Sequence, residues 1–213
     1  MRDAATVHPS LTTYADLIWP APGSTWRVGL ARSAVLALLG ACLLTLSAKV
    51  QVPGPVPMTL QTLAVLALGA MLGMRLALAS VLLYLAEGAL GLPVFANTPP
   101  LAPGLAYLVG PTGGFLAGFV LAAGMVGFAA DRGLARRPIP FALVLAAASA
   151  SLLAAGWAWL AFGVSVQAGS GLGLGRAFEL GIRPFLLGEG IKLGLAAMAL
   201  PLALEALGRR LRR

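Results

Sequence analysis

Four stretches of this chain contain no charged residue: 33–48, 50–74, 88–130 and 138–175. The chain as a whole is 59% apolar and only 10% charged, whereas globular proteins carry about 25% charged residues. A soluble core formed by 213 residues cannot bury so much apolar surface. A lipid bilayer suits such runs, because about 20 apolar residues of helix cross its core. The sequence therefore predicts an all-α integral membrane protein.

The scarcity of reactive side chains excludes several kinds of site. The chain has one cysteine, Cys42, and one histidine, His8. It therefore has no disulfide framework, no metal site built from Cys or His, and no Ser/His/Asp triad. We expect no cofactor. The net charge of +8 could suggest a nucleic-acid partner, but most Lys and Arg residues lie where a membrane protein keeps its cytoplasmic charges, so we expect no nucleic acid.

Six transmembrane helices are expected, over 28–48, 58–72, 76–90, 110–130, 141–164 and 181–207. A cytoplasmic tail, 1–27, precedes the membrane domain, 28–213. Three prolines exclude a helix from 51–57, and Gly73 and Arg75 separate the second helix from the third. Both of these helices are only about 15 residues long, so a re-entrant hairpin is the alternative to two spans. The segments 91–107 and 164–180 are expected to be external loops.

The distribution of positive charge indicates the orientation. One side of the membrane receives eleven of the 15 Lys and Arg residues, and the other receives Lys49, Arg176 and Arg183. Cytoplasmic segments are enriched in Lys and Arg, so both termini are predicted to be cytoplasmic. This requires an even number of spans.

A carboxylate and an ammonium lie three residues apart in the last helix, at Glu189 and Lys192. Residues at this spacing share a helix face, and ionisable groups at membrane depth usually face the interior of a bundle. The pair is therefore a candidate binding site, with a purely structural ion pair as the alternative. Glu87 is a weaker candidate, because it lies near a helix end.

Other polar side chains gather toward the outer side: Gln61, Asn97, Tyr107 and Thr112. Groups from distant parts of the chain that share a membrane face can converge on one small solute, as in transporter sites with short or interrupted spans. The Gly-rich segments 110–114 and 171–175 lack the Lys-Ser/Thr of a phosphate-binding loop. Any ATPase must therefore be a partner protein, and we interpret 171–175 as a flexible loop.

Small residues recur every four positions in the first helix, among them Ser33, Ala37 and Ala41. This spacing allows two helix backbones to approach closely. It is typical of a contact with a partner protein, and internal packing is the alternative.

Three motifs in register resemble a known family. They are VPGPVPMTLQT at 52–62, YLAEGALGLPVFA at 84–96 and GPTGGFLAGF at 110–119. In these motifs the chain resembles BioY, the biotin-specific substrate-binding subunits of energy-coupling factor (ECF) transporters. The likeness covers about residue 28 to the C-terminus.

The resemblance implies a non-enzymatic subunit in the bacterial cytoplasmic (inner) membrane that captures biotin. Its implied partners are a transmembrane coupling subunit and two cytoplasmic ATPases. It places Glu189, Lys192 and Asn97 in the pocket, makes 51–57 a lid over the vitamin, and assigns the small residues of the first helix to the coupling subunit. The chain departs from the family with Glu189 in place of the more common Asp and with Phe115 in place of a common Tyr.

The chemistry of biotin suits these residues. Its ureido N–H groups match a carboxylate such as Glu189, and its carbonyl matches a donor such as Asn97 or Lys192. Apolar walls for its thioether ring are expected from Tyr84, Phe95, Tyr107 and Trp157. A carrier for another small solute, or a carrier that needs no ATPase, is the alternative. An intramembrane enzyme is disfavoured, because no nucleophile and base accompany the Glu189–Lys192 pair.

Overall fold

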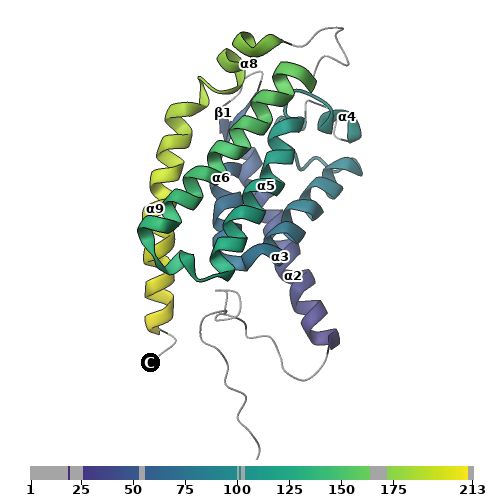
Figure 1. The fold of residues 1–213 in the computed structure, drawn as a ribbon. Helices are drawn as coiled ribbons and strands as arrows, with labels where there is room; N and C mark the ends of the chain where they lie inside the picture. The colour runs from purple at the N-terminus through teal and green to yellow at the C-terminus, as the bar shows by residue number, and fades with distance from the viewer. Residues whose placement is uncertain are drawn as a thin grey trace, which may run out of the picture.

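A computed structural model describes residues 19, 26–52, 56–99, 101, 104–163 and 172–210. Long helices run side by side in a bundle, with the short helices α4 and α8 and the strand β1 at one end (Figure 1). The elements in chain order are α2 Trp26–Lys49, β1 Gln51–Val52, β2 Met58–Thr59, α3 Gln61–Ala89, α4 Leu105–Leu108, α5 Gly113–Asp131, η1 Leu134–Arg136, α6 Pro138–Ala158, η2 Trp159–Gly163, α8 Gly173–Gly181 and α9 Phe185–Arg210.

Several of these helices are suited to a bilayer. Within the described part of the chain, four are long and apolar enough to cross a membrane: α2, α3, α5, and α6 continued by η2. Their outer surfaces expose large apolar side chains such as Leu39, Leu82 and Leu143. Water would penalise so large an apolar exterior, whereas lipid would not. The prediction of a multi-pass helical membrane protein is confirmed.

Helix α3 is a hairpin of two arms. Gly73, with φ of 75° and ψ of 177°, interrupts it in a backbone conformation that favours glycine. Across this turn the Gln61 Nε2 atom donates a hydrogen bond to the Tyr84 hydroxyl at 2.7 Å. In a straight helix, residues 23 positions apart would be separated by about 35 Å. The predicted break between the second and third helices is therefore confirmed.

The turn of this hairpin packs directly against α5. The Asp131 carboxylate, at the end of α5, accepts a hydrogen bond from the Met74 backbone N–H at 3.1 Å. Gly127 lies one turn earlier, where an added Cβ would approach the Met74 Cα to 2.5 Å and the Gly73 carbonyl carbon to 2.8 Å. The missing side chain at Gly127 thus permits close contact between the two backbones.

The small residues of α2 face the interior of this chain. Ala37 and Ala41 are buried, and Ala41 belongs to the hydrophobic core together with Leu44. The Ser33 hydroxyl donates to the Gly29 carbonyl of its own helix at 3.0 Å. Partner docking at Ala37 and Ala41 stays a prediction, and the burial of both side chains within this chain is what its alternative, internal packing, expects. Sequence spacing shows only that two backbones can approach closely, and not which chain the second backbone belongs to.

Three local expectations need correction. The predicted lid, 51–57, begins with strand β1, which pairs antiparallel with β2 so that Gln51 opposes Thr59 and Val52 opposes Met58; the fold is therefore not purely helical. Part of the predicted loop 164–180 is helix α8, which includes Gly173 and Gly175 of the expected flexible loop. The last helix accordingly begins at Phe185. Most of the predicted tail, 1–27, lies outside the described residues, but the Trp19 carbonyl accepts a hydrogen bond from the Arg32 Nε atom at 2.7 Å.

Candidate functional site

A cavity lies among α3, α5, α6, α9 and the strand pair. It holds about 510 Å³ of empty space, its opening included. Its lining residues are Val56, Pro57, Thr59, Gln61, Thr62, Tyr84, Ala96, Tyr107, Thr112, Phe115, Leu116, Phe119, Leu152, Leu153, Phe185, Glu189 and Lys192. The Gly73 turn brings Gln61 and Tyr84 together on this lining, although they belong to different arms of α3.

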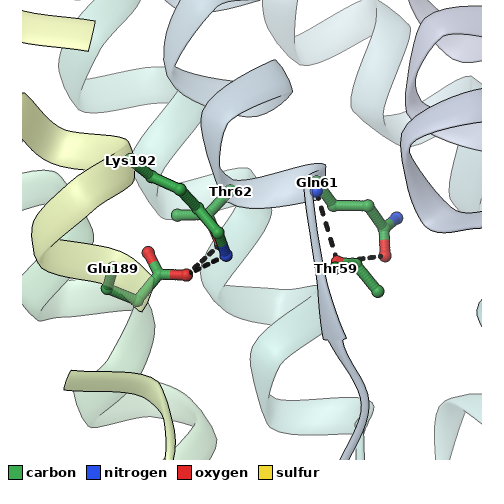
Figure 2. A network of polar contacts seen from close by, with 5 residues as sticks. All are labelled: Thr59, Gln61, Thr62, Glu189 and Lys192. Carbon is green, nitrogen blue, oxygen red and sulfur yellow. Dashed lines mark hydrogen bonds and ion pairs between the residues drawn. The ribbon is translucent and has the colours of Figure 1, made fainter. Parts of the chain in front are cut away.

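One side of the cavity carries a buried ion pair. The Lys192 Nζ atom lies 2.5 Å from the Glu189 Oε1 atom, and the two side chains are only 12% and 7% exposed. Thr62, which belongs to α3, donates its hydroxyl hydrogen to the same oxygen of Glu189 at 3.0 Å (Figure 2). The second carboxylate oxygen, Oε2, is buried without a hydrogen-bond partner among the described residues. Because buried polar atoms are rarely left unpaired, Oε2 is an acceptor suited to a ligand N–H.

A second polar group, on β2 and the start of α3, lies apart from the ion pair in Figure 2. The Thr59 hydroxyl donates to the Gln61 Oε1 atom at 3.2 Å and accepts from the Gln61 backbone N–H at 3.2 Å. The Gln61 Nε2 atom donates to the Tyr84 hydroxyl at 2.7 Å. These bonds fix the Gln61 amide and the Tyr84 ring at the cavity wall.

Aromatic rings supply much of the remaining wall. Phe115 of α5 and Phe185 of α9 are stacked, with ring centroids 5.7 Å apart and planes 24° apart. Tyr107, on the short helix α4, donates its hydroxyl hydrogen to the Ala96 carbonyl at 2.8 Å. Burial raises the pKa of the Tyr107 hydroxyl, so this group remains a neutral donor at pH 7. The cavity thus combines flat apolar surfaces with a few fixed polar groups.

Six of the seven predicted binding residues line this cavity: Gln61, Tyr84, Tyr107, Thr112, Glu189 and Lys192. Asn97 is not among the lining residues, and its binding role stays a prediction. It occupies a left-handed turn with φ of 56°, where its backbone carbonyl accepts from the Leu101 N–H at 2.8 Å. Its neighbour Ala96 lines the cavity instead.

Two residues that are predicted to form apolar walls, Trp157 and Phe95, do not line the cavity. Trp157 donates its ring N–H to the Leu174 carbonyl at 3.1 Å, and Phe95 packs behind the Tyr84 and Tyr107 rings. Neither lines the cavity, where Phe115, Phe119 and Phe185 stand with the two tyrosines. Glu87 does not line it either.

Sequence reasoning missed several lining residues, notably Thr59, Thr62, Phe119 and Phe185. Thr62 follows Gln61 in the sequence. Because Gln61 is predicted to begin a helix at the site, its neighbour Thr62 could have been predicted as a lining residue. Phe185 offers none, because an isolated aromatic residue in an apolar helix has no distinguishing pattern. Val56 and Pro57 belong to the predicted lid, whose residues 53–55 lie outside the described part of the chain.

The fold and the site together define a multi-pass helical membrane protein with a cavity that combines apolar aromatic walls with a buried carboxylate. A model of the BioY family matches residues 17–209, which is most of the chain. The chain belongs to the BioY family.

Curated relatives match part of the chain. The biotin transporter BioY of Thermotoga maritima is 40% identical over 102 residues, which cover 47% of this chain and 59% of the relative. The probable biotin transporter BioY of Pyrococcus horikoshii is 40% identical over 98 residues, covering 46% of this chain and 59% of the relative. The matches thus span less than two thirds of these relatives' length.

A solved structure supports the fold over a longer span. The crystal structure of the S-component for biotin from an ECF-type ABC transporter aligns with a TM-score of 0.69. The alignment covers 85% of this chain and 95% of that one, at 18% sequence identity. At this identity the likeness establishes a shared fold.

Proposed function

We propose that this protein captures biotin as the substrate-binding subunit of an ECF-type ABC transporter and has no enzymatic activity. The observation that carries the proposal is the Glu189 carboxylate. It lies in a cavity walled by aromatic rings, with one oxygen bonded to Lys192 and Thr62 and the other without a partner among the described residues. Membership of the BioY family and the names of its relatives support biotin as the ligand.

The polar chemistry of the cavity matches the two ends of the ureido group. A ureido N–H would donate to the Glu189 Oε2 atom, and the ureido carbonyl would accept from Lys192 or from another donor of the lining. The stacked rings of Phe115 and Phe185 would cover the fused thioether ring. Val56 and Pro57, which line the cavity, support a lid role for the segment 51–57.

Equilibrium binding of labelled biotin to the purified protein, beside a panel of other water-soluble vitamins, tests the function. We expect saturable, stoichiometric binding of biotin and no competition by the other vitamins. Tighter binding of another vitamin would support a carrier for a different solute. Absence of binding by every compound would reject the binding subunit altogether.

The transport assembly is part of the same proposal. We infer six membrane spans, with the two arms of α3 counted separately, and both termini on the cytoplasmic side of a bacterial inner membrane. Because the chain has no phosphate-binding loop, energy would come from two cytoplasmic ATPases through a transmembrane coupling subunit. Of the first-helix residues predicted to contact that subunit, only Ser33 keeps partial exposure.

The orientation can be checked by labelling single cysteines in whole cells in a Cys42→Ala background. Leu101, which is 53% exposed, and the exposed Glu179 of α8 are predicted to be external, and the exposed Arg136 is predicted to be cytoplasmic. We expect an impermeant thiol reagent to modify cysteines at 101 and 179, and a cysteine at 136 only after lysis. If the reagent modified only the cysteine at position 136 in intact cells, the predicted orientation would be wrong and the opposite one would be indicated.

A further inference from the structure

Lys49, the last residue of α2, holds a distant turn of the chain. Its Nζ atom donates to the backbone carbonyls of Pro93 at 2.7 Å, Phe95 at 2.8 Å and Thr98 at 2.6 Å. A lysine ammonium has three N–H donors, so these three carbonyls use all of them. The charged end of the side chain is thus directed at the turn.

This turn forms the back of the cavity wall. Ala96 lines the cavity, and its carbonyl accepts the hydrogen bond from the Tyr107 hydroxyl. The Phe95 ring packs edge-on against Tyr84, with centroids 5.4 Å apart, and is stacked on Tyr107, with centroids 4.6 Å apart. Phe95 is fully buried and therefore supports both lining rings from behind. A displacement of the turn would move Ala96, Tyr84 and Tyr107 together.

Lys49 also adjoins the lid. Strand β1 begins two residues later, at Gln51, and pairs with β2, which leads into Gln61. The backbone N–H of Leu60 donates to the Val50 carbonyl at 3.2 Å and closes the base of this strand pair. The same ammonium thus ties the start of the strand pair to the turn behind the cavity wall.

We propose that Lys49 is a positioning residue for biotin binding. It acts through the 93–98 turn on Tyr107 and Tyr84 and does not itself line the cavity. The inference rests on the proposed biotin-binding function. Charge-assisted hydrogen bonds to three carbonyls hold the turn more firmly than neutral bonds would, which keeps the aromatic wall in its binding geometry before the ligand arrives.

The test measures biotin affinity by calorimetry for four proteins: wild type, Lys49→Met, Lys49→Arg and Arg183→Met. We expect Lys49→Met to bind about tenfold more weakly and Lys49→Arg, which keeps charged donors, to recover most of the loss. Arg183 is an exposed cation that pairs only with Glu179 on α8 among the described residues, so its variant should bind as the wild type does. Hydrogen exchange of the backbone amides of residues 94–98 without ligand should be faster in Lys49→Met alone.

A double-mutant cycle with Tyr107→Phe separates positioning from a general loss of stability. If Lys49 acts through the turn that holds Tyr107, the two changes together should weaken binding by less than the product of their separate effects. Multiplicative effects, wild-type affinity in Lys49→Met, or no rescue by Lys49→Arg would overturn the inference. Failure of the wild-type protein to bind biotin would instead reject the proposed function, and the positioning role would fall with it.

Discussion

Glu189→Gln is expected to weaken biotin binding by about 30- to 1,000-fold. The substitution keeps the shape of the side chain but replaces a charge-assisted hydrogen bond with a neutral one, and it leaves the Lys192 ammonium without its counter-ion in a buried site. Losses of this kind amount to about 2 to 4 kcal/mol, and each 1.4 kcal/mol is about tenfold in affinity. Lys192→Met should be similarly severe, because the carboxylate then keeps only the neutral Thr62 hydrogen bond and has no counter-ion at low dielectric. Calorimetric titration with biotin measures both variants.

A purely structural ion pair would give a different result. Both variants would then unfold at a lower temperature without ligand, yet the protein that remained folded would bind biotin with wild-type affinity. Melting temperature and affinity should therefore be measured on the same preparations. Unchanged affinity in Glu189→Gln would end its assignment as a ligand-binding residue.

Gly127→Ala is expected to lower the free energy of unfolding by about 1 to 3 kcal/mol, the usual cost of overpacking. The added Cβ would lie 2.5 Å from the Met74 Cα and 2.6 Å from the Met74 backbone nitrogen. These are backbone atoms at the turn of α3, which cannot rotate away as a side chain would. The measurement is thermal unfolding in detergent without ligand.

Gly124→Ala is the matched control, because it lies in the same helix three residues earlier. An added Cβ there meets only the Leu78 Cδ2 atom, at an ordinary 3.7 Å. Alanine also favours a helix over glycine, so this variant should be as stable as the wild type or slightly more so. Equal melting temperatures for the two variants would show that α5 and the turn of α3 are not in close contact.

Periodicity and charge along the sequence are enough to indicate much of the architecture. The break at Gly73 can be predicted from the sequence, because a glycine and the charged Arg75 together interrupt an apolar run. The Glu189–Lys192 pair is readable because residues three apart share a helix face. Both signals are local, and each depends on charged residues, which are rare in this chain.

The remaining features depend on contacts between distant segments. The Thr62 hydroxyl reaches Glu189 across 127 positions, and no spacing rule anticipates such a bond. The spacing of the small residues of α2 predicts a close helix contact but does not say whether the second helix belongs to this chain or to a partner, so the partner contact stays a prediction. The polar side chain of Asn97 predicts a ligand contact. Its place in the structure, however, is set by the left-handed backbone turn that it occupies, which the sequence does not indicate. Helix α8 could not be predicted from the sequence, because three of its nine residues are glycine, which disfavours a helix.

One Glu189 oxygen accepts two hydrogen bonds and the other accepts none among the described residues, and this difference lowers the entropy cost of binding a ligand. Two donors on Oε1 already restrict the rotamers of this side chain in the empty protein. Ordering a free glutamate side chain costs about 1.5 to 2 kcal/mol, and here that cost is met during folding and not at the encounter with the ligand. Because Oε2 has no donor to release among the described residues, a ligand can also engage it without breaking a bond there. A ligand that donates to Oε2 would thus require little rearrangement of the charged group of the cavity.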